Sequence, residues 1–140
     1  MNIGLIGYGK MGKTIERIAL ERGHTIAFKV DSKNPLVNQD LSTADVAIEF
    51  TQPSLAVGHM EQCFAGKLPV VVGTTAWQEQ LPYIQSLAKK QQAALLYASN
   101  FSVGVNIVFQ LNERLAQLMS KQNSYSASIE EIHHTQKLDA

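Results

Sequence analysis

The side chains best suited to acid–base chemistry lie near the carboxyl end of the sequence. His133 and His134 are adjacent, and Lys137 follows four positions after the first histidine. Histidine changes its charge near neutral pH and is the commonest general acid, whereas lysine supplies a fixed positive charge. Clustered cations would make His133 less basic than a free imidazole. The cluster could therefore hold a proton donor at His133, with Lys137 suited to a carboxylate or to charge that develops during a reaction. An ordinary surface histidine pair is the alternative, and the cluster by itself does not distinguish the two.

A zinc site is the other chemistry that two histidines allow. Side chains of adjacent residues on a strand diverge, and neither a third nor a fourth ligand is evident near His133 and His134. No metal site is therefore predicted.

A glycine-rich turn close to the amino terminus has the spacing of a nucleotide-binding motif. Residues 7–12 read Gly-Tyr-Gly-Lys-Met-Gly, a G-x-G-x-x-G between an apolar strand and a helix. Gly7 permits the tight turn, Gly9 lets the backbone approach a pyrophosphate, and Gly12 allows close helix–strand packing. Asp31 closes the next strand, 19 positions after Gly12, where a carboxylate bonds ribose hydroxyls. These features predict a dinucleotide site; a turn required only for packing is the alternative.

The choice between NADH and NADPH depends on the charges around Asp31. A carboxylate repels a 2′-phosphate and favours NADH, whereas Lys33 and Lys10 are cations that could contact such a phosphate. Both lysines are also typical solvated surface charges. We expect NADH to be used at least as well as NADPH.

Small polar loops follow three later strands, at the edge of a parallel sheet where ligands bind. They are Thr51-Gln52-Pro53, Gly73-Thr74-Thr75 and the loop that contains Ser99, Asn100 and Phe101. Hydroxyl and amide groups suit a carboxamide or a ribose, and Phe101 could pack on a nicotinamide ring. Helix capping and turn chemistry are the alternative reading of each loop.

These positions require strands that alternate with helices. Apolar runs predict strands over 2–6, 24–30, 45–50, 69–72 and 93–98, and helical spacing predicts helices over 10–22, 55–66, 78–91 and 103–121, with Ser54 and Thr75 as caps. This order predicts an α/β protein with a Rossmann-like, doubly wound parallel sheet. Alternation over 124–132 predicts the first strand of a second, α+β domain. We expect a dinucleotide-binding domain over 1–123 and the start of a substrate domain over 124–140.

Composition narrows the class further. The formal net charge is zero, which gives no basic field for nucleic acid. Cys63 is the only cysteine, so an internal disulfide is impossible and a reducing compartment is expected. The amino terminus lacks a signal-peptide pattern, and no run approaches the roughly 20 apolar residues of a membrane span. A cytoplasmic location is the resulting expectation.

Several of these segments match one known family. The chain resembles 4-hydroxy-tetrahydrodipicolinate reductase, also called dihydrodipicolinate reductase, of lysine and diaminopimelate biosynthesis. The matching segments occur in family order along the whole chain. They are the glycine turn and residues 49–53 (Glu-Phe-Thr-Gln-Pro), 72–75 (Val-Gly-Thr-Thr), 100–106 (Asn-Phe-Ser-Val-Gly-Val-Asn) and 131–140 (Glu-Ile-His-His-Thr-Gln-Lys-Leu-Asp-Ala).

The resemblance implies NADH- or NADPH-dependent reduction of a cyclic dicarboxylate, with hydride transfer to ring C4 and protonation of the resulting enamine. By position, His133 is similar to the family's general acid, Lys137 to its partner and His134 to a substrate contact. The cofactor site is implied at the glycine turn and at Asp31, Gly73, Thr74, Thr75, Ala98, Ser99, Asn100 and Phe101. Family members are typically homotetramers.

The chain departs from the family pattern at three places. Many members have one more residue in the glycine turn, and many carry Glu-Arg where this chain has Asp31-Ser32. The family signature also continues beyond Asp139-Ala140 with Pro-Ser-Gly-Thr, which binds a substrate carboxylate. We therefore expect the sequence to be the first part of a longer enzyme, and the 140-residue piece alone to be inactive.

Two other functions agree with part of the sequence. A nucleotide-binding Rossmann module without catalysis would need only the glycine turn and Asp31. Another amino-acid dehydrogenase, such as aspartate or homoserine dehydrogenase, would share that turn. Neither of these two dehydrogenases accounts for the ending from His133 to Ala140.

Overall fold

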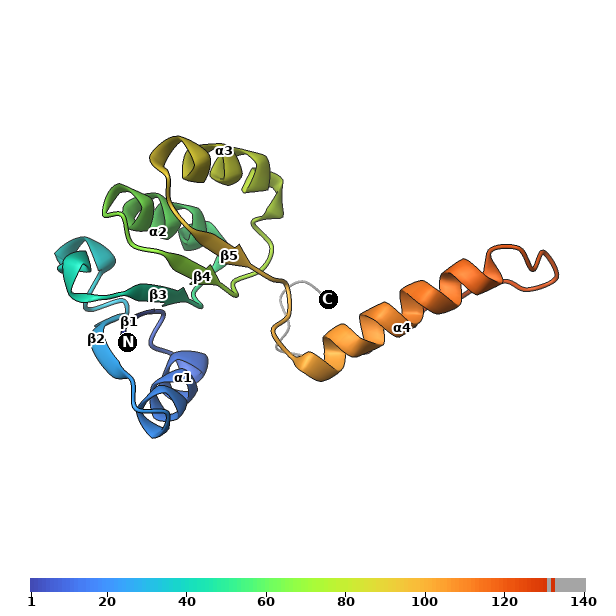
Figure 1. Cartoon of the computed structure of the whole chain (residues 1–140), viewed down its shortest axis with the longest axis horizontal. Coiled ribbons are helices and arrows are strands. Elements are labelled where there is room, and N and C mark those ends of the chain that lie inside the picture. Colours follow the sequence, from blue (N-terminus) through green and yellow to red (C-terminus); the bar gives the residue numbers. More distant parts are fainter. Residues whose placement is uncertain (131, 133–140) are drawn as a thin grey trace. The chain divides into compact units, whose positions relative to one another are not determined.

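The computed structural model describes residues 1–130 and 132. Strands and helices alternate through this part of the chain, as the hydrophobic periodicity predicts (Figure 1). The elements are β1 (Asn2–Ile6), α1 (Lys10–Glu21), β2 (Thr25–Val30), β3 (Val46–Glu49), α2 (Pro53–Ala65), β4 (Val70–Val72), α3 (Leu81–Gln91), β5 (Leu95–Tyr97) and α4 (Val103–Met119), with short 3₁₀ turns at Leu36–Asn38, Leu41–Thr43 and Gln78–Gln80.

The strands form one parallel sheet in the order β2-β1-β3-β4-β5. Parallel strands are covered on both faces and therefore tend to be continuous apolar runs, of which the three valines of β4 are an example. The central strand β3 pairs with β1 and β4, so that Glu49 lies between Ile6 and Val72 in register. All carboxyl ends of the strands meet at one edge.

Helices cover both faces of this sheet, which makes it doubly wound (Figure 1). On one face, Ala19 of α1 packs with Ile3 and Leu5 of β1. On the other face, α2 and α3 bury a larger apolar cluster that includes Met60 and Ile84. The predicted α/β, Rossmann-like fold with a parallel sheet is thus confirmed.

Two predicted helix caps are wrong. Helix α2 starts at Pro53 with Gln52 in the capping position, so Ser54 already lies inside the helix. Helix α3 starts at Leu81 after a 3₁₀ turn, and Thr75 does not cap it. In both helices a proline occupies the first turn, where its missing N–H costs nothing because that group has no helical partner.

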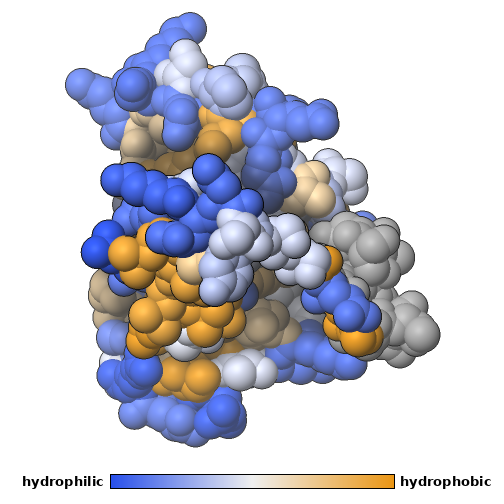
Figure 2. All heavy atoms as spheres, turned by 90° about the vertical axis from the view of Figure 1, so that its right-hand side faces the viewer, coloured by the Kyte–Doolittle hydropathy of each residue, from blue (hydrophilic) through white to orange (hydrophobic). Residues whose placement is uncertain are grey.

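The chain divides into two compact units, Met1–Phe101 and a second unit from Ser102 onward. In the second unit, Ser102 caps α4 by accepting the Val105 N–H, and no residue of this helix is buried. The side chains of the predicted apolar face are exposed; they are Ile107, Val108, Leu111, Leu115, Leu118 and Met119. Orange areas in Figure 2 show apolar residues at the surface of the molecule.

The strand predicted over 124–132 is absent from the described residues of that range. A strand needs a partner for its backbone N–H and C=O groups, and alternation of side chains cannot supply one. Within residues 1–130 and 132, no helix has both the length and the apolarity needed to cross a membrane.

Candidate functional site

The glycine turn joins β1 to α1 at the carboxyl edge of the sheet. The backbone N–H groups of Gly7 and Tyr8 donate to the Val30 carbonyl at 3.1 and 2.9 Å, which ties the turn to β2. Gly7 has a φ of +100°, and a Cβ there would lie 2.0 Å from the carbonyl oxygen of Phe50. A Cβ on Gly12 would lie 2.3 Å from the carbonyl oxygen of Gly7. Both glycines are required by the protein's own backbone.

Gly9 differs from these two glycines. A Cβ at Gly9 would meet no atom of the described chain within 4 Å. Gly9 is also the capping residue of α1, and within this described helix neither a side-chain cap nor an acidic residue satisfies the first turn. Helix N-termini present free N–H groups and a positive dipole end to anions. The open space beside Gly9 therefore fits a phosphate or pyrophosphate group.

Tyr8, the residue between the first two glycines, is held by charged side chains. Its hydroxyl donates to Glu16 Oε2, and Lys29 Nζ lies 2.6 Å from Glu16 Oε1 and 4.7 Å from the centre of the Tyr8 ring. The hydrogen bond from Lys29, together with that from Tyr8, lowers the pKa of Glu16, and the same contact with Glu16 raises the pKa of Lys29. This arrangement fixes the turn from the α1 side.

Asp31 is placed at the end of β2, as predicted. Its Oδ1 accepts the backbone N–H groups of Lys33 and Asn34 at 2.8 and 2.9 Å, which orders the loop that follows. Lys33 and Lys10 are both exposed. A cavity of about 510 Å³ brings Asp31 together with the glycine turn and the loop after β3; the predicted site residues in its lining are Gly7, Tyr8, Gly9 and Asp31.

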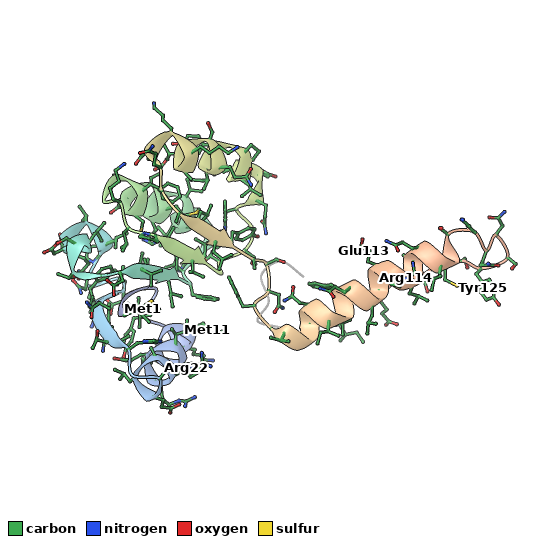
Figure 3. All side chains as sticks on the ribbon, in the orientation of Figure 1. Met1, Met11, Arg22, Glu113, Arg114 and Tyr125 are labelled. Atoms are coloured by element: carbon green, nitrogen blue, oxygen red, sulfur yellow. The ribbon has the colours of Figure 1, made fainter. Side chains whose placement is uncertain are left out.

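A second cavity, of about 280 Å³, lies at the ends of β3 and β4. It joins Met11, which Figure 3 labels on α1, to Gly73, Thr74 and Thr75. A Cβ on Gly73 would lie 2.1 Å from the Phe50 ring, so this glycine allows the Phe50 side chain to pack closely against the backbone.

Only some residues of the loop after β5 contact the residues around the second cavity. The Phe101 and Phe50 rings have centroids 6.4 Å apart, which places Phe101 beside the Phe50 side chain. Ala98 donates its N–H to the Val72 carbonyl at 3.4 Å. Ser99 and Asn100 follow on the same loop, and these residues, like Lys10, are outside the lining of both cavities.

The end of β3 contains polar groups whose role the sequence analysis missed. Glu49 is 0% exposed, Thr51 donates its hydroxyl to Glu49 Oε1, and His59 Nδ1 lies 3.5 Å from that oxygen. Burial, with a contribution from the Glu49 charge, raises the pKa of the Cys63 thiol to about 12, so this thiol is neutral. The sequence did contain one indication of this cluster, because Glu49 is an acidic residue at the end of a strand that is otherwise apolar.

The terminal cluster of His133, His134 and Lys137 lies outside the described residues, so its roles stay predictions. Among residues 1–130 and 132, no group of three or more His, Cys, Asp or Glu side chains is placed to hold a metal ion.

The parallel sheet with a glycine turn at its carboxyl edge defines a Rossmann-like protein. Solved structures agree on the fold. A UDP-N-acetylglucosamine 3-dehydrogenase from Acidithiobacillus ferrooxidans superposes with a TM-score of 0.57 at 17% identity, covering 69% of this chain and 36% of that one. A biliverdin reductase from Synechocystis superposes with a TM-score of 0.52 at 14% identity, covering 69% and 37%.

Sequence comparison identifies the family. Residues 1–101 match "Dihydrodipicolinate reductase, N-terminus", and residues 104–140 match "Dihydrodipicolinate reductase, C-terminus". The chain belongs to the dihydrodipicolinate reductase family, and the expected start of a second domain is confirmed by the second match. Family and fold together indicate a nucleotide cofactor.

Curated relatives extend the match over the whole chain. A 4-hydroxy-tetrahydrodipicolinate reductase from Christiangramia forsetii is 48% identical over 142 residues, which cover 100% of this chain and 59% of that protein. The same enzyme from Thermosipho africanus is 32% identical over 141 residues, covering 99% and 61%. The chain thus spans about three fifths of the length of these relatives.

Proposed function

We propose that this chain is the cofactor-binding part of an NADH- or NADPH-dependent 4-hydroxy-tetrahydrodipicolinate reductase. The observation that carries the proposal is the cavity of about 510 Å³ that joins the glycine turn to Asp31. The open space at Gly9 and the uncapped start of α1 suit the pyrophosphate, and the Asp31 carboxylate suits the adenosine ribose. The cofactor would supply the hydride. The named relatives support the choice of substrate.

The acid chemistry is proposed for the terminal cluster. His133 is the general acid that protonates the reduced substrate, Lys137 stabilises charge and assists that proton transfer, and His134 contacts the substrate. These roles rest on the family resemblance of residues 131–140. In a preparation that turns over substrate, replacing His133 or Lys137 by alanine should lower kcat by about 10²–10⁴-fold with little change in cofactor affinity. Unchanged kcat in both variants would remove these residues from the chemistry.

The second cavity is proposed to receive the nicotinamide half of the cofactor. Thr74 and Thr75 present hydroxyl groups there, and Phe101 contributes an aromatic ring beside Phe50. Ser99 and Asn100 would complete this end of the site from the loop after β5. The support is their position at the carboxyl ends of β4 and β5, the edge at which open parallel sheets bind ligands.

NADH is proposed to be used at least as well as NADPH. Asp31 would repel a 2′-phosphate, and its Oδ1 is held in place by the loop amides of Lys33 and Asn34. Calorimetric titration of the 140-residue chain with each cofactor tests this, with Asp31→Asn as the matched variant. We expect the variant to bind NADH about tenfold more weakly and to lose its discrimination against NADPH. A wild-type chain that binds neither cofactor would contradict the nucleotide assignment.

The remaining expectations complete the proposal. A dinucleotide-binding domain over 1–123 and a substrate domain from 124 are the proposed division, although the match to the family's C-terminal part starts at residue 104 and so includes α4. The exposed apolar side chains of α4 agree with a helix that packs against further protein. A homotetramer and a cytoplasmic location are proposed by analogy with the family. A nucleotide-binding module without catalysis is the alternative function. It would bind NADH in the titration but would show no reduction of 4-hydroxy-tetrahydrodipicolinate in an activity assay.

A further inference from the structure

The carboxylate of Glu49 occupies a place in the sheet that normally takes an apolar residue. Glu49 ends the central strand β3, is 0% exposed, and lies in register between Ile6 and Val72. Its Oε2 is buried and has no hydrogen-bond partner among residues 1–130 and 132. Burying a carboxyl group with one oxygen unpaired costs free energy, so the fold alone would favour an apolar residue here.

The other oxygen of Glu49 is connected through Thr51 to the two cavities described above. Thr51 donates its hydroxyl to Glu49 Oε1, and His59 Nδ1 lies 3.5 Å from both the Thr51 hydroxyl and that oxygen. The Thr51 backbone N–H donates to Thr74 Oγ1 at 2.8 Å, and the Thr74 carbonyl accepts from Trp77 Nε1 at 2.7 Å. One chain of contacts thus runs from the buried carboxylate to the loops after β3 and β4.

Thr51 is common to both cavities. It lines the larger one together with His59 and Asp31, and the smaller one together with Thr74. The Thr51 methyl group also faces the glycine turn, because a Cβ on Gly7 would lie 2.9 Å from it. A rotation of this side chain would therefore alter the walls that the adenosine and nicotinamide halves of a dinucleotide would contact.

We propose that Glu49 is a positioning residue for the cofactor, acting through Thr51. The carboxylate holds the Thr51 side chain in the rotamer that shapes both cavities and leaves the Thr51 N–H directed at Thr74. The inference rests on the proposed function, because it assumes that a dinucleotide occupies these cavities. On this proposal, burial of Glu49 lowers stability, and its carboxylate organises the loop beside the cofactor.

Glu49→Leu and Thr51→Val test this role, with NADH as the probe. Leucine fills the space of Glu49 without an acceptor, and valine keeps the shape of Thr51 without the hydroxyl. The matched controls are Glu49→Gln, which keeps an acceptor, and Thr51→Ser, which keeps the hydroxyl. Affinity is measured by energy transfer from Trp77, the only tryptophan, to bound NADH, and stability by thermal melting.

We expect Glu49→Leu and Thr51→Val each to raise the Kd for NADH about tenfold, and the two controls to raise it less than about threefold. The double variant Glu49→Leu/Thr51→Val should bind no more weakly than either single variant, since both remove the same contact. The melting temperature of Glu49→Leu should equal or exceed that of the wild type. A purely structural carboxylate would give the opposite pattern of unchanged affinity and lower stability.

Unchanged NADH affinity in Glu49→Leu, or losses that multiply in the double variant, would overturn the inference. If Glu49→Leu does not fold, the test becomes the comparison of Thr51→Val with Thr51→Ser. Equal NADH affinities of these two variants would overturn the inference. A wild-type chain that binds no NADH contradicts the proposed function itself. A wild-type chain that binds, with variants that bind equally well, contradicts only the role of Glu49.

Discussion

The glycine turn and the loop after β3 face the same cavity but are built in different ways. The turn shapes the cavity with backbone: Gly7 and Gly12 allow main-chain atoms to approach closely, and Gly9 leaves open space. The β3 loop and the helix α2 that follows it shape the cavity with side chains, through Thr51 of the loop and His59 of the helix, both beside the buried Glu49. At Gly7 and Gly12 the backbone wall has no room for an added atom, whereas a wall made of side chains can be adjusted by one hydrogen bond.

The largest effect should come from adding a methyl group to the backbone wall. Gly7→Ala would place a Cβ 2.0 Å from the Phe50 carbonyl oxygen at a φ of +100°. We expect a loss of roughly 3 kcal/mol or more in the free energy of unfolding, because strained φ and a steric clash add together. Urea denaturation followed by circular dichroism measures it. A stability within about 1 kcal/mol of the wild type would show that the turn can move away from β3.

Gly9→Ala is the matched control on the same wall. Its φ of −88° suits alanine, and the Cβ would meet no described atom within 4 Å. The free energy of unfolding should change by less than about 1 kcal/mol, while the Kd for NADH rises roughly a hundredfold because the methyl group occupies the space of the pyrophosphate. NADH affinity equal to that of the wild type would place the pyrophosphate elsewhere.

Glu16→Gln tests whether the backbone wall also depends on side chains. Tyr8 and Lys29 both contact the Glu16 carboxylate and lower its pKa, so this group stabilises the fold above its unfolded pKa, near 4.5, and loses that contribution as pH falls through the lower folded value. The variant should be less stable than the wild type at pH 7, and the difference should shrink toward pH 3. Urea midpoints across this range measure it; a constant difference would mean that the ionised carboxylate is not involved.

The smallest effect concerns the reactivity of Cys63, which reports how firmly α2 packs on the sheet. Cys63 is a buried residue of α2, and burial, with a contribution from the Glu49 charge, raises the pKa of its thiol to about 12. We expect no measurable reaction with a thiol reagent at pH 8 in the folded chain, and full reaction in denaturant. Fast labelling of the folded chain would indicate that α2 opens locally away from the sheet.

The two walls also differ in how far the sequence predicts them. Glycine spacing identifies Gly7 and Gly12 because no other residue type meets their backbone requirements, and it identifies Gly9 as the position where a side chain would fill open space. The carboxylate of Glu49 gives no such signal, since its burial depends on β3 becoming the central strand, and that position is set by pairing across the whole sheet.

The same limit explains the incorrect local predictions. Ser54 and Thr75 have the side chains of good caps, but Pro53 and Pro82 fix the first helical turns nearby. The alternating segment over 124–132 lacks a strand partner among the described residues, and alternation alone cannot create one. Propensity chose the type of most elements correctly, whereas their ends and partners depended on tertiary contacts.

The parallel order of the sheet has a kinetic consequence. Ile3 pairs with Ile26 on one side and with Val46 on the other, so neither ladder of β1 can form as a hairpin. Each must close a long loop that contains a helix or extended turns before its hydrogen bonds are gained, and such topologies fold more slowly than helical bundles of similar size. During synthesis on the ribosome, β1 must therefore wait, unpaired and apolar, until β2 and then β3 have emerged.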